Sequence, residues 1–385
     1  MPTHDEMVRS ARELAPMIRA VARSAELAGR PDDGVIAAAR EAGLFTMMSP
    51  RVFGGSELDL DTFLEVGLIL GEADASHGWV LGFYFEHVWM FSQFPEVFQK
   101  ELFADQSYVL APAMLSPTGR ATEVSGGFEL SGRWAWGTGI YHADWVIAGA
   151  IVQRSTGLEA LFFALPREQV QLDTDSWQVD GMCATGSYDI VIEDVFVPIE
   201  RAVSIPEMLN ASATGSQIHT GPLYSTPMAP ILSFAAALPV LGQAKACIAE
   251  FARQQHERYD LARLEAQANR TSRQSRLAAA DLDVAAAEQL ARWVVADVMD
   301  KRGNADEATR VRWTSSIAHV VHICQRAIDV VCEAAGASSH FLDNPLQRAR
   351  RDVHTMACHV VFDIDERYRC HGRSLLGMAS ESVWH

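Results

Sequence analysis

Residues 131–145, SGRWAWGTGIYHADW, combine side chains that could together hold a flat ring. Trp134 and Trp136 stand two residues apart, so on a β-strand both would point to one face. A glycine on each side of Thr138 weakens a strand and allows close approach to its backbone. A large apolar surface beside a hydroxyl suits a flat polar ring system. The same pattern also fits a glycine-kinked strand whose tryptophans fill a core.

Several other kinds of chemistry lack their sequence motifs. His319 and His322 share a helix face, but no carboxylate or thiol at ligand spacing completes a metal site. The sequence has no GxSxG elbow for a hydrolase, and it has no GxGxxG or Walker motif for a nucleotide. Its 6 cysteines are scattered without a CxxC pair, which predicts free thiols in a cytosolic protein.

Charge and composition narrow the class of protein further. A net charge of −17 argues against nucleic acid and anionic membranes as partners. Apolar residues make up 49% of the 385 residues, enough for a large core. The N-terminal segment lacks the apolar stretch of a signal peptide. The longest apolar run, residues 230–242, contains Pro239 and is too short for a bilayer of about 30 Å. We therefore expect a cytoplasmic protein.

Three zones that differ in predicted secondary structure must position these residues. Residues 1–105 are predicted to be helical, with Asp59 or Asp61 as a candidate N-cap. Residues 106–227 hold short β-rich runs without helices between them, which favours a small antiparallel barrel or sandwich. Residues 228–385 are helical again and predict a four-helix bundle, with helices near 228–256, 276–301, 305–335 and 345–376. The predicted fold class is α+β, mostly α, with the functional site where the lobes meet.

Three segments in this order resemble the acyl-CoA dehydrogenase fold over nearly the whole chain. They are LSGRWAWGTGIYHADWVIAGA (130–150), GMCATGSYDIVIEDVFVP (181–198) and GASSHFLDNPLQRARRD (336–352). Many family members carry a catalytic glutamate within Glu-Gly-Thr, eight residues after an Arg-Asp pair. Here the eighth residue after Asp352 is Val360, with His359 beside it. RDVHTMACH (351–359), SGRW (131–134) and ATGS (184–187) are instead similar to the oxygenase components of two-component flavin monooxygenases.

That resemblance implies a cofactor and its contacts. A separate flavin reductase would supply FMNH2 or FADH2, and O2 would form a C4a-hydroperoxyflavin that oxygenates an aromatic or polycyclic molecule. Trp136 would form a wall for the flavin ring, Thr138 would be the hydrogen-bond partner of its N5 atom, and Gly139 would let its edge meet the backbone. Further flavin contacts are implied for Trp177, Ser187, Arg258 and, from a neighbouring subunit of a homotetramer, Gly336 and Ser338.

The histidines are interpreted through the same resemblance. His359 is the expected proton donor, since a histidine titrates in the working pH range. His354 lies five residues earlier, about 140° around a helix, so we expect only one of the two to face the site. His87, on an aromatic N-terminal helix, is expected near the substrate, with His354 as a second candidate substrate contact. Each could instead be a core histidine with a satisfied partner.

Three functions therefore stay open from the sequence. The leading hypothesis is the oxygenase component just described. The second is an FAD-dependent dehydrogenase or oxidase of the same fold, with its catalytic base at another position. The third is a flavin-binding or ligand-binding scaffold without catalysis, in which replacing His359 would change no rate.

Overall fold

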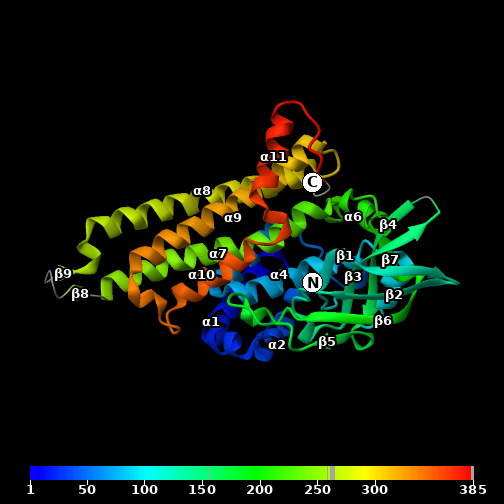
Figure 1. The fold of residues 1–385 in the computed structure, drawn as a ribbon, viewed down its shortest axis with the longest axis horizontal. Helices are drawn as coiled ribbons and strands as arrows, with labels where there is room; N and C mark the ends of the chain where they lie inside the picture. Colours follow the sequence, from blue (N-terminus) through cyan, green and yellow to red (C-terminus); the bar gives the residue numbers. More distant parts are fainter. Residues whose placement is uncertain (156, 258, 261–264, 383–385) are drawn as a thin grey trace.

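The computed structural model describes residues 1–155, 157–257, 259–260 and 265–382. Helices lead into a sheet and then return in long antiparallel runs (Figure 1). The N-terminal helices are α1 (His4–Ala28), α2 (Asp33–Glu41), α3 (Leu60–Ala73), α4 (Ala75–Phe91) and α5 (Glu96–Leu102). The carboxylate of Asp59 accepts the Leu60 N–H, so Asp59 rather than Asp61 is the cap of α3. Asp74 caps α4 in the same way, accepting the N–H of His77.

The middle of the chain forms one mixed sheet of seven strands, in the order β5-β6-β2-β1-β3-β4-β7. The strands are β1 (Ala113–Val124), β2 (Gly127–Trp134), β3 (Trp145–Arg154), β4 (Gly157–Pro166), β5 (Gln171–Asp173), β6 (Asp189–Pro198) and β7 (Ala202–Ser204). The prediction of a purely antiparallel lobe is wrong at one pair, because β1 and β3 are parallel. β3 follows β2 in the chain and pairs with the other edge of β1, where it runs parallel to β1.

The C-terminal part consists mainly of long helices. They are α7 (Met228–Glu257), α8 (Thr271–Lys301), α9 (Glu307–Ala335), α10 (Pro345–Met356) and α11 (Ile364–Leu375), after the short α6 (Ile205–Leu209). The two-residue strands β8 (Tyr259–Asp260) and β9 (Glu265–Ala266) join α7 to α8. α7 is long and apolar enough to cross a membrane, although the sequence predicts that the apolar run 230–242 within it is too short. However, 83% of the most apolar 18-residue stretch of α7 is buried inside the protein, as in a core helix.

The predicted final helix, 345–376, is broken between α10 and α11. The chain leaves the helix after Met356 and makes a single 3-10 turn, η11 (Val360–Phe362). His359 accepts the N–H of Val361, and Asp363 accepts the N–H of Glu366. Two new helix starts therefore lie inside the predicted helix, because each supplies a side-chain acceptor for a free backbone N–H. The rotation argument that separated His354 from His359 does not apply.

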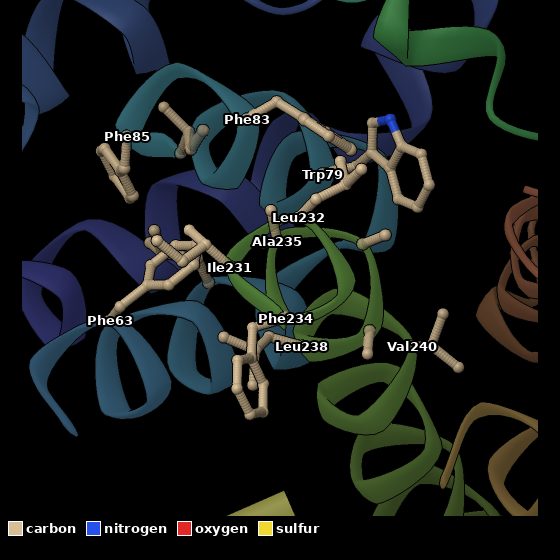
Figure 2. Packing of buried hydrophobic residues seen from close by; sticks show 14 of the residues in the cluster. Phe63, Trp79, Phe83, Phe85, Ile231, Leu232, Phe234, Ala235, Leu238 and Val240 are labelled. Carbon is tan, nitrogen blue, oxygen red and sulfur yellow. The ribbon is translucent and has the colours of Figure 1, made fainter. Parts of the chain in front are cut away.

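Close packing of α3, α4 and α7 builds the core beside the sheet. A Cβ on Gly71 would lie 2.5 Å from the Cα of Pro239, so only glycine allows α3 to approach α7 at that level. Phe63 of α3, Trp79 of α4 and Leu232 of α7 belong to the resulting cluster (Figure 2). Every residue of α4 is buried. This helix therefore has no solvent face, and its aromatic side chains can contact only other elements or an internal space.

Candidate active site

One cavity of about 1240 Å³ lies where the helices meet the sheet lobe. It is bounded by α4, the first residues of β1, the loops 135–138 and 178–182, α10 and η11. The loops reach it from the sheet lobe, and the end of α10 reaches it from the C-terminal helices. The cavity therefore lies at the junction of the lobes, where the sequence predicts the functional site.

Trp79, Phe83 and His87 of α4 form the inner wall of this cavity. Their spacing of four residues places them on one side of the helix, because an α-helix has 3.6 residues per turn. The ring centroids of Trp79 and Phe83 are 4.8 Å apart, and those of Phe83 and His87 are 5.3 Å apart. The three side chains are 4%, 5% and 1% exposed. The cavity thus has a continuous aromatic face that excludes bulk water.

His359 faces this wall from η11. Its ring centroid lies 5.6 Å from that of Trp79 and 6.2 Å from that of Phe83. Its Nδ1 accepts the N–H of Val361 at 3.5 Å, so in the neutral ring the proton is on Nε2. Burial lowers the pKa of His359 to about 4. At pH 7 the ring is therefore a neutral hydrogen-bond donor, and its expected role as a proton donor stays a prediction.

Thr138 lines the same cavity, as the sequence predicts. Its hydroxyl lies 3.0 Å from the Oγ of Ser187, and the indole N–H of Trp79 donates to it at 3.4 Å. Trp79 therefore contacts both Thr138 and His359. The two residues border one space, with a single indole between them on the inner wall.

The two tryptophans of the opening motif have different environments. β2 ends at Trp134, whose side chain is 1% exposed and donates to the carbonyl of Gly149 at 2.7 Å. Trp136 follows the strand with φ 68°, is 55% exposed and packs edge-on against Trp177 at 5.2 Å. The prediction that both point to one face of a strand is wrong, because the chain leaves the strand between them. Both still line the cavity, Trp134 from within the sheet lobe and Trp136 at the exposed mouth.

The neighbouring glycines are required by contacts within the protein. A Cβ on Gly137 would lie 2.7 Å from the carbonyl oxygen of Tyr188. At Gly139, where φ is 76°, a Cβ would lie 2.6 Å from the Tyr84 hydroxyl. Gly139 is not among the residues that line the cavity. Its predicted contact with a flavin stays a prediction, and packing against Tyr84 already explains the glycine.

His87 turns both ring nitrogens into the protein. Nδ1 lies 2.6 Å from the carbonyl of Ala111, so Nδ1 carries the proton. Nε2 lies 3.1 Å from Oε2 of Glu86, whose side chain is fully buried and has no hydrogen bond among the described residues. Burial raises the pKa of Glu86 to about 8 and lowers that of His87 to about 4. The neutral imidazole of the inner wall is therefore backed by a neutral acid, Glu86.

His354 also lines the cavity, contrary to the expectation that only one of the two histidines would. Its Nε2 lies 3.0 Å from Oδ1 of Asp329, and the same oxygen accepts the Nε–H of Arg350 at 2.6 Å. The His354 side chain is 43% exposed, in contrast to the inner wall. This cluster forms the charged part of the mouth.

Arg351 and Asp352 hold the loop 178–182 against α10. The guanidinium of Arg351 donates to the carbonyl of Asp180 and pairs with Glu26 of α1. Oδ1 of Asp352 accepts the N–H of Met182 at 2.7 Å, and Met182 has φ 59°, a conformation uncommon outside glycine. The Arg-Asp pair, which the sequence used only to locate a missing glutamate, thus shapes one side of the cavity.

The remaining predicted flavin contacts that the structure describes are not among the residues that line the cavity. Ser187 is buried and hydrogen-bonded to Thr138 and Thr185, and Trp177 donates to the carbonyl of Cys183 while it packs on Trp136. Gly336 ends α9 and Ser338 lies in the following turn, so their predicted contact with a neighbouring subunit stays a prediction. Arg258 lies outside the described residues. Sequence analysis missed Trp79, Phe83 and Glu86, although the spacing of Trp79, Phe83 and His87 by four carried a signal.

The lining is chemically suited to a flat aromatic cofactor. It offers broad apolar walls with a few hydroxyls, among them Thr138 beside Trp79, and one neutral imidazole donor, His359. Typical small-molecule pockets measure about 300–1,000 Å³. A cavity of about 1240 Å³ therefore has room for a tricyclic ring and a second, smaller ring side by side.

Comparison with known proteins agrees with this site. The family described as acyl-CoA dehydrogenase, C-terminal domain, matches residues 234–364. The chain is 29% identical to the flavin-dependent monooxygenase oxygenase subunit HsaA of Rhodococcus jostii, over 95% of this chain and 97% of that protein. It is also 29% identical to the oxygenase component of the FADH2-dependent resorcinol hydroxylase of a Rhizobium species, over 97% of this chain and 95% of that protein.

A solved structure extends the likeness to the whole fold. The 3-HSA hydroxylase of Rhodococcus sp. RHA1 superposes with a TM-score of 0.94 at 28% identity and covers 100% of both chains. The protein therefore has the acyl-CoA dehydrogenase fold. The two full-length relatives named above are oxygenase components of flavin-dependent enzymes.

Proposed function

We propose that the protein uses reduced flavin and O2 to hydroxylate a small aromatic molecule held against the inner wall of the cavity. In the overall reaction, one oxygen atom of O2 enters a C–H bond of the substrate and the other leaves as water. Reduced flavin, bound in the cavity, would supply the two electrons that this balance requires. The observation that carries the proposal is that Thr138 and His359 line one cavity and both contact Trp79.

Each residue would have a distinct role. Thr138 would hold a polar edge of the flavin ring, and its contact with Ser187 fixes the hydroxyl in place. His359 would donate a hydrogen bond from Nε2–H, because its Nδ1 accepts a backbone N–H and its pKa is too low for a cation at pH 7. Trp136 and Trp177 would shield the ring at the mouth, since exclusion of water protects a reactive oxygen species from unproductive decay.

The lining also weighs against the dehydrogenase alternative. A dehydrogenase of this fold needs a carboxylate that faces the substrate. Asp180 is the single carboxylic acid among the described residues of the lining, and it is exposed at the mouth. Val360 stands at the position where many acyl-CoA dehydrogenases carry the catalytic glutamate, and the side chain of Val360 is apolar.

The proposal includes the partners implied by the two-component relatives. A separate reductase would deliver reduced flavin, FMNH2 or FADH2, to this cytoplasmic enzyme. The enzyme would act as a homotetramer, for which the exposed side chains of Phe341, Leu375 and Leu376 offer apolar surface. Light scattering of the purified protein tests the assembly.

The decisive experiment uses isotopically labelled oxygen. Protein is mixed anaerobically with photoreduced FMN or FAD, then with ¹⁸O2 and a phenol such as resorcinol or 2-naphthol. We expect a hydroxylated product that contains one ¹⁸O atom, and slower reoxidation of the flavin than in free solution. Reoxidation at the free rate with every phenol, and no labelled product, would refute the proposal. Bleaching of bound FAD by an acyl thioester would favour the dehydrogenase instead.

A further inference from the structure

The cavity has an inside and a mouth that differ in exposure. The inner wall residues Trp79 and Phe83 are 4% and 5% exposed, whereas Trp136 and Val360 at the mouth are 55% and 50% exposed. A substrate that stacks on the inner wall is therefore removed from water. Any charge it carries must find a partner inside the protein or stay unpaired at a large energetic cost.

The cationic side chains of the described lining are Arg350 and Arg351, and both are already paired. The Nε of Arg350 donates to Asp329 at 2.6 Å. Arg351 pairs with Glu26 and also donates to a backbone carbonyl. Although burial alone would raise it, the pKa of Glu26 is lowered by hydrogen bonds from Arg351 and Arg23, so this partner is charged at neutral pH. Each arginine therefore already has a carboxylate partner, and a ligand anion would have to compete with Asp329 or Glu26 for it.

The histidines of the lining give no positive charge at the inner wall. Burial lowers the pKa of both His87 and His359 to about 4, so both rings are neutral at pH 7. Both nitrogens of His87 are directed at protein atoms, Ala111 and Glu86. The third histidine, His354, lies at the mouth against Asp329. The inner wall is therefore apolar and uncharged.

We propose that the substrate of this site is an uncharged aromatic molecule, and that aromatic carboxylates are excluded. The proposal rests on the proposed function and adds a substrate class to it. A neutral ring can stack on the Trp79–Phe83 face without losing a charge–water interaction. A carboxylate would be buried beside neutral rings and near arginines that are already paired with Asp329 and Glu26. The net charge of −17 also lowers the local concentration of anionic ligands.

Matched ligand pairs test this selectivity. Each pair has the same ring and differs in charge: 4-hydroxyphenylacetamide with 4-hydroxyphenylacetate, and indole-3-acetamide with indole-3-acetate. Binding to the flavin-free protein is followed by quenching of tryptophan fluorescence, to which Trp79 contributes. We expect the amides to bind at least about ten-fold more tightly, a difference of about 1.4 kcal/mol. Equal or tighter binding of the carboxylates, or no binding of either amide, would overturn the proposal.

A variant tests the physical reason. Asp329→Asn leaves the charge of Arg350 unbalanced, so carboxylate affinity should rise by about five-fold or more while amide affinity stays within two-fold. Asp281→Asn is the matched control, because it removes the same charge from an exposed position on α8. Equal gains in both variants, or no gain in Asp329→Asn, would overturn the role of the Arg350–Asp329 pair.

The two levels of the proposal fail in different ways. Absence of flavin-dependent ¹⁸O incorporation would refute the proposed function, yet the binding comparison on flavin-free protein would still measure selectivity. Conversely, ¹⁸O incorporation into an aromatic carboxylate at the rate of its amide would overturn the selectivity and leave the proposed function standing.

Discussion

Two glutamates next to the cavity have opposite charge states. Glu86, behind the inner wall, has no cationic partner among the described residues, and burial raises its pKa to about 8. Glu26, beside the mouth, is also well buried, yet it accepts from two arginines and its pKa is lowered. The same side chain is therefore neutral on one side of the cavity and anionic on the other. The inner wall is built to hold uncharged rings, and the mouth to balance charges.

The largest effect should come from a change at His359, which faces the inner wall. His359→Asn removes the Nε2–H donor while keeping a polar side chain of smaller size, so hydroxylation should fall about 100-fold or more. Phenol binding to the flavin-free protein should stay within about three-fold. Single-turnover product formation measures the first and fluorescence titration the second.

The corresponding change at the mouth sharpens this comparison. His354→Asn alters a histidine that already pairs with Asp329, and we expect less than a five-fold loss. Equal losses in the two variants would contradict the distinction between wall and mouth. Unchanged rates in both would favour a scaffold without catalysis.

Asp352 holds the loop 178–182 against α10, and its replacement should have the next largest effect. Asp352→Ala leaves the buried N–H of Met182 and the hydroxyl of Ser76 without their acceptor, at a cost of about 1–3 kcal/mol in unfolding free energy. Asp352→Asn keeps one acceptor oxygen and should recover most of that loss. Urea denaturation monitored by circular dichroism measures both. Equal destabilisation by the two variants would show that charge at position 352, rather than the acceptor, matters.

The protonation of Glu86 predicts a dependence of stability on pH. Its folded pKa of about 8 exceeds the unfolded value, so the folded state binds more protons and stability falls as pH rises toward 8. Glu86→Gln should remove up to about 2 kcal/mol of this fall between pH 6.5 and 8. The histidines with lowered pKa act in the opposite direction and below pH 6.5. Denaturation at pH 6.5, 7.2 and 8.0 measures the slope, and an identical slope in both proteins would mean that Glu86 is ionised.

The smallest effect is expected at Trp136. Its side chain is 55% exposed, so Trp136→Ala should change the unfolding free energy by less than about 0.5 kcal/mol. Loss of its contact with Trp177 should weaken flavin retention by a few fold, measured by equilibrium dialysis of oxidised FMN or FAD. A large loss of stability would show that Trp136 belongs to the core and not to the mouth.

Much of the fold was predictable from local signals. Asp59 before a run of apolar residues predicted the start of α3, and the apolar stripe around Val321 predicted α9. The break at His359 was not predictable from periodicity, because the residues on both sides are compatible with a helix. Side-chain acceptors at His359 and Asp363 decided it. The parallel pairing of β1 and β3 also depends on which sheet edge is free, a property of the assembled lobe.

The sequence by itself determined the types of residue at this site and their order: Trp136 and Thr138 on a glycine-rich segment, His359 after the Arg-Asp pair, and His87 on an aromatic helix. Only the tertiary structure decided their chemical states. Burial without a counter-charge makes His359, His87 and Glu86 neutral, and Arg350 and Arg351 are paired with Asp329 and Glu26. A pKa depends on the solvent and charges around a group, and residues distant in the sequence supply both.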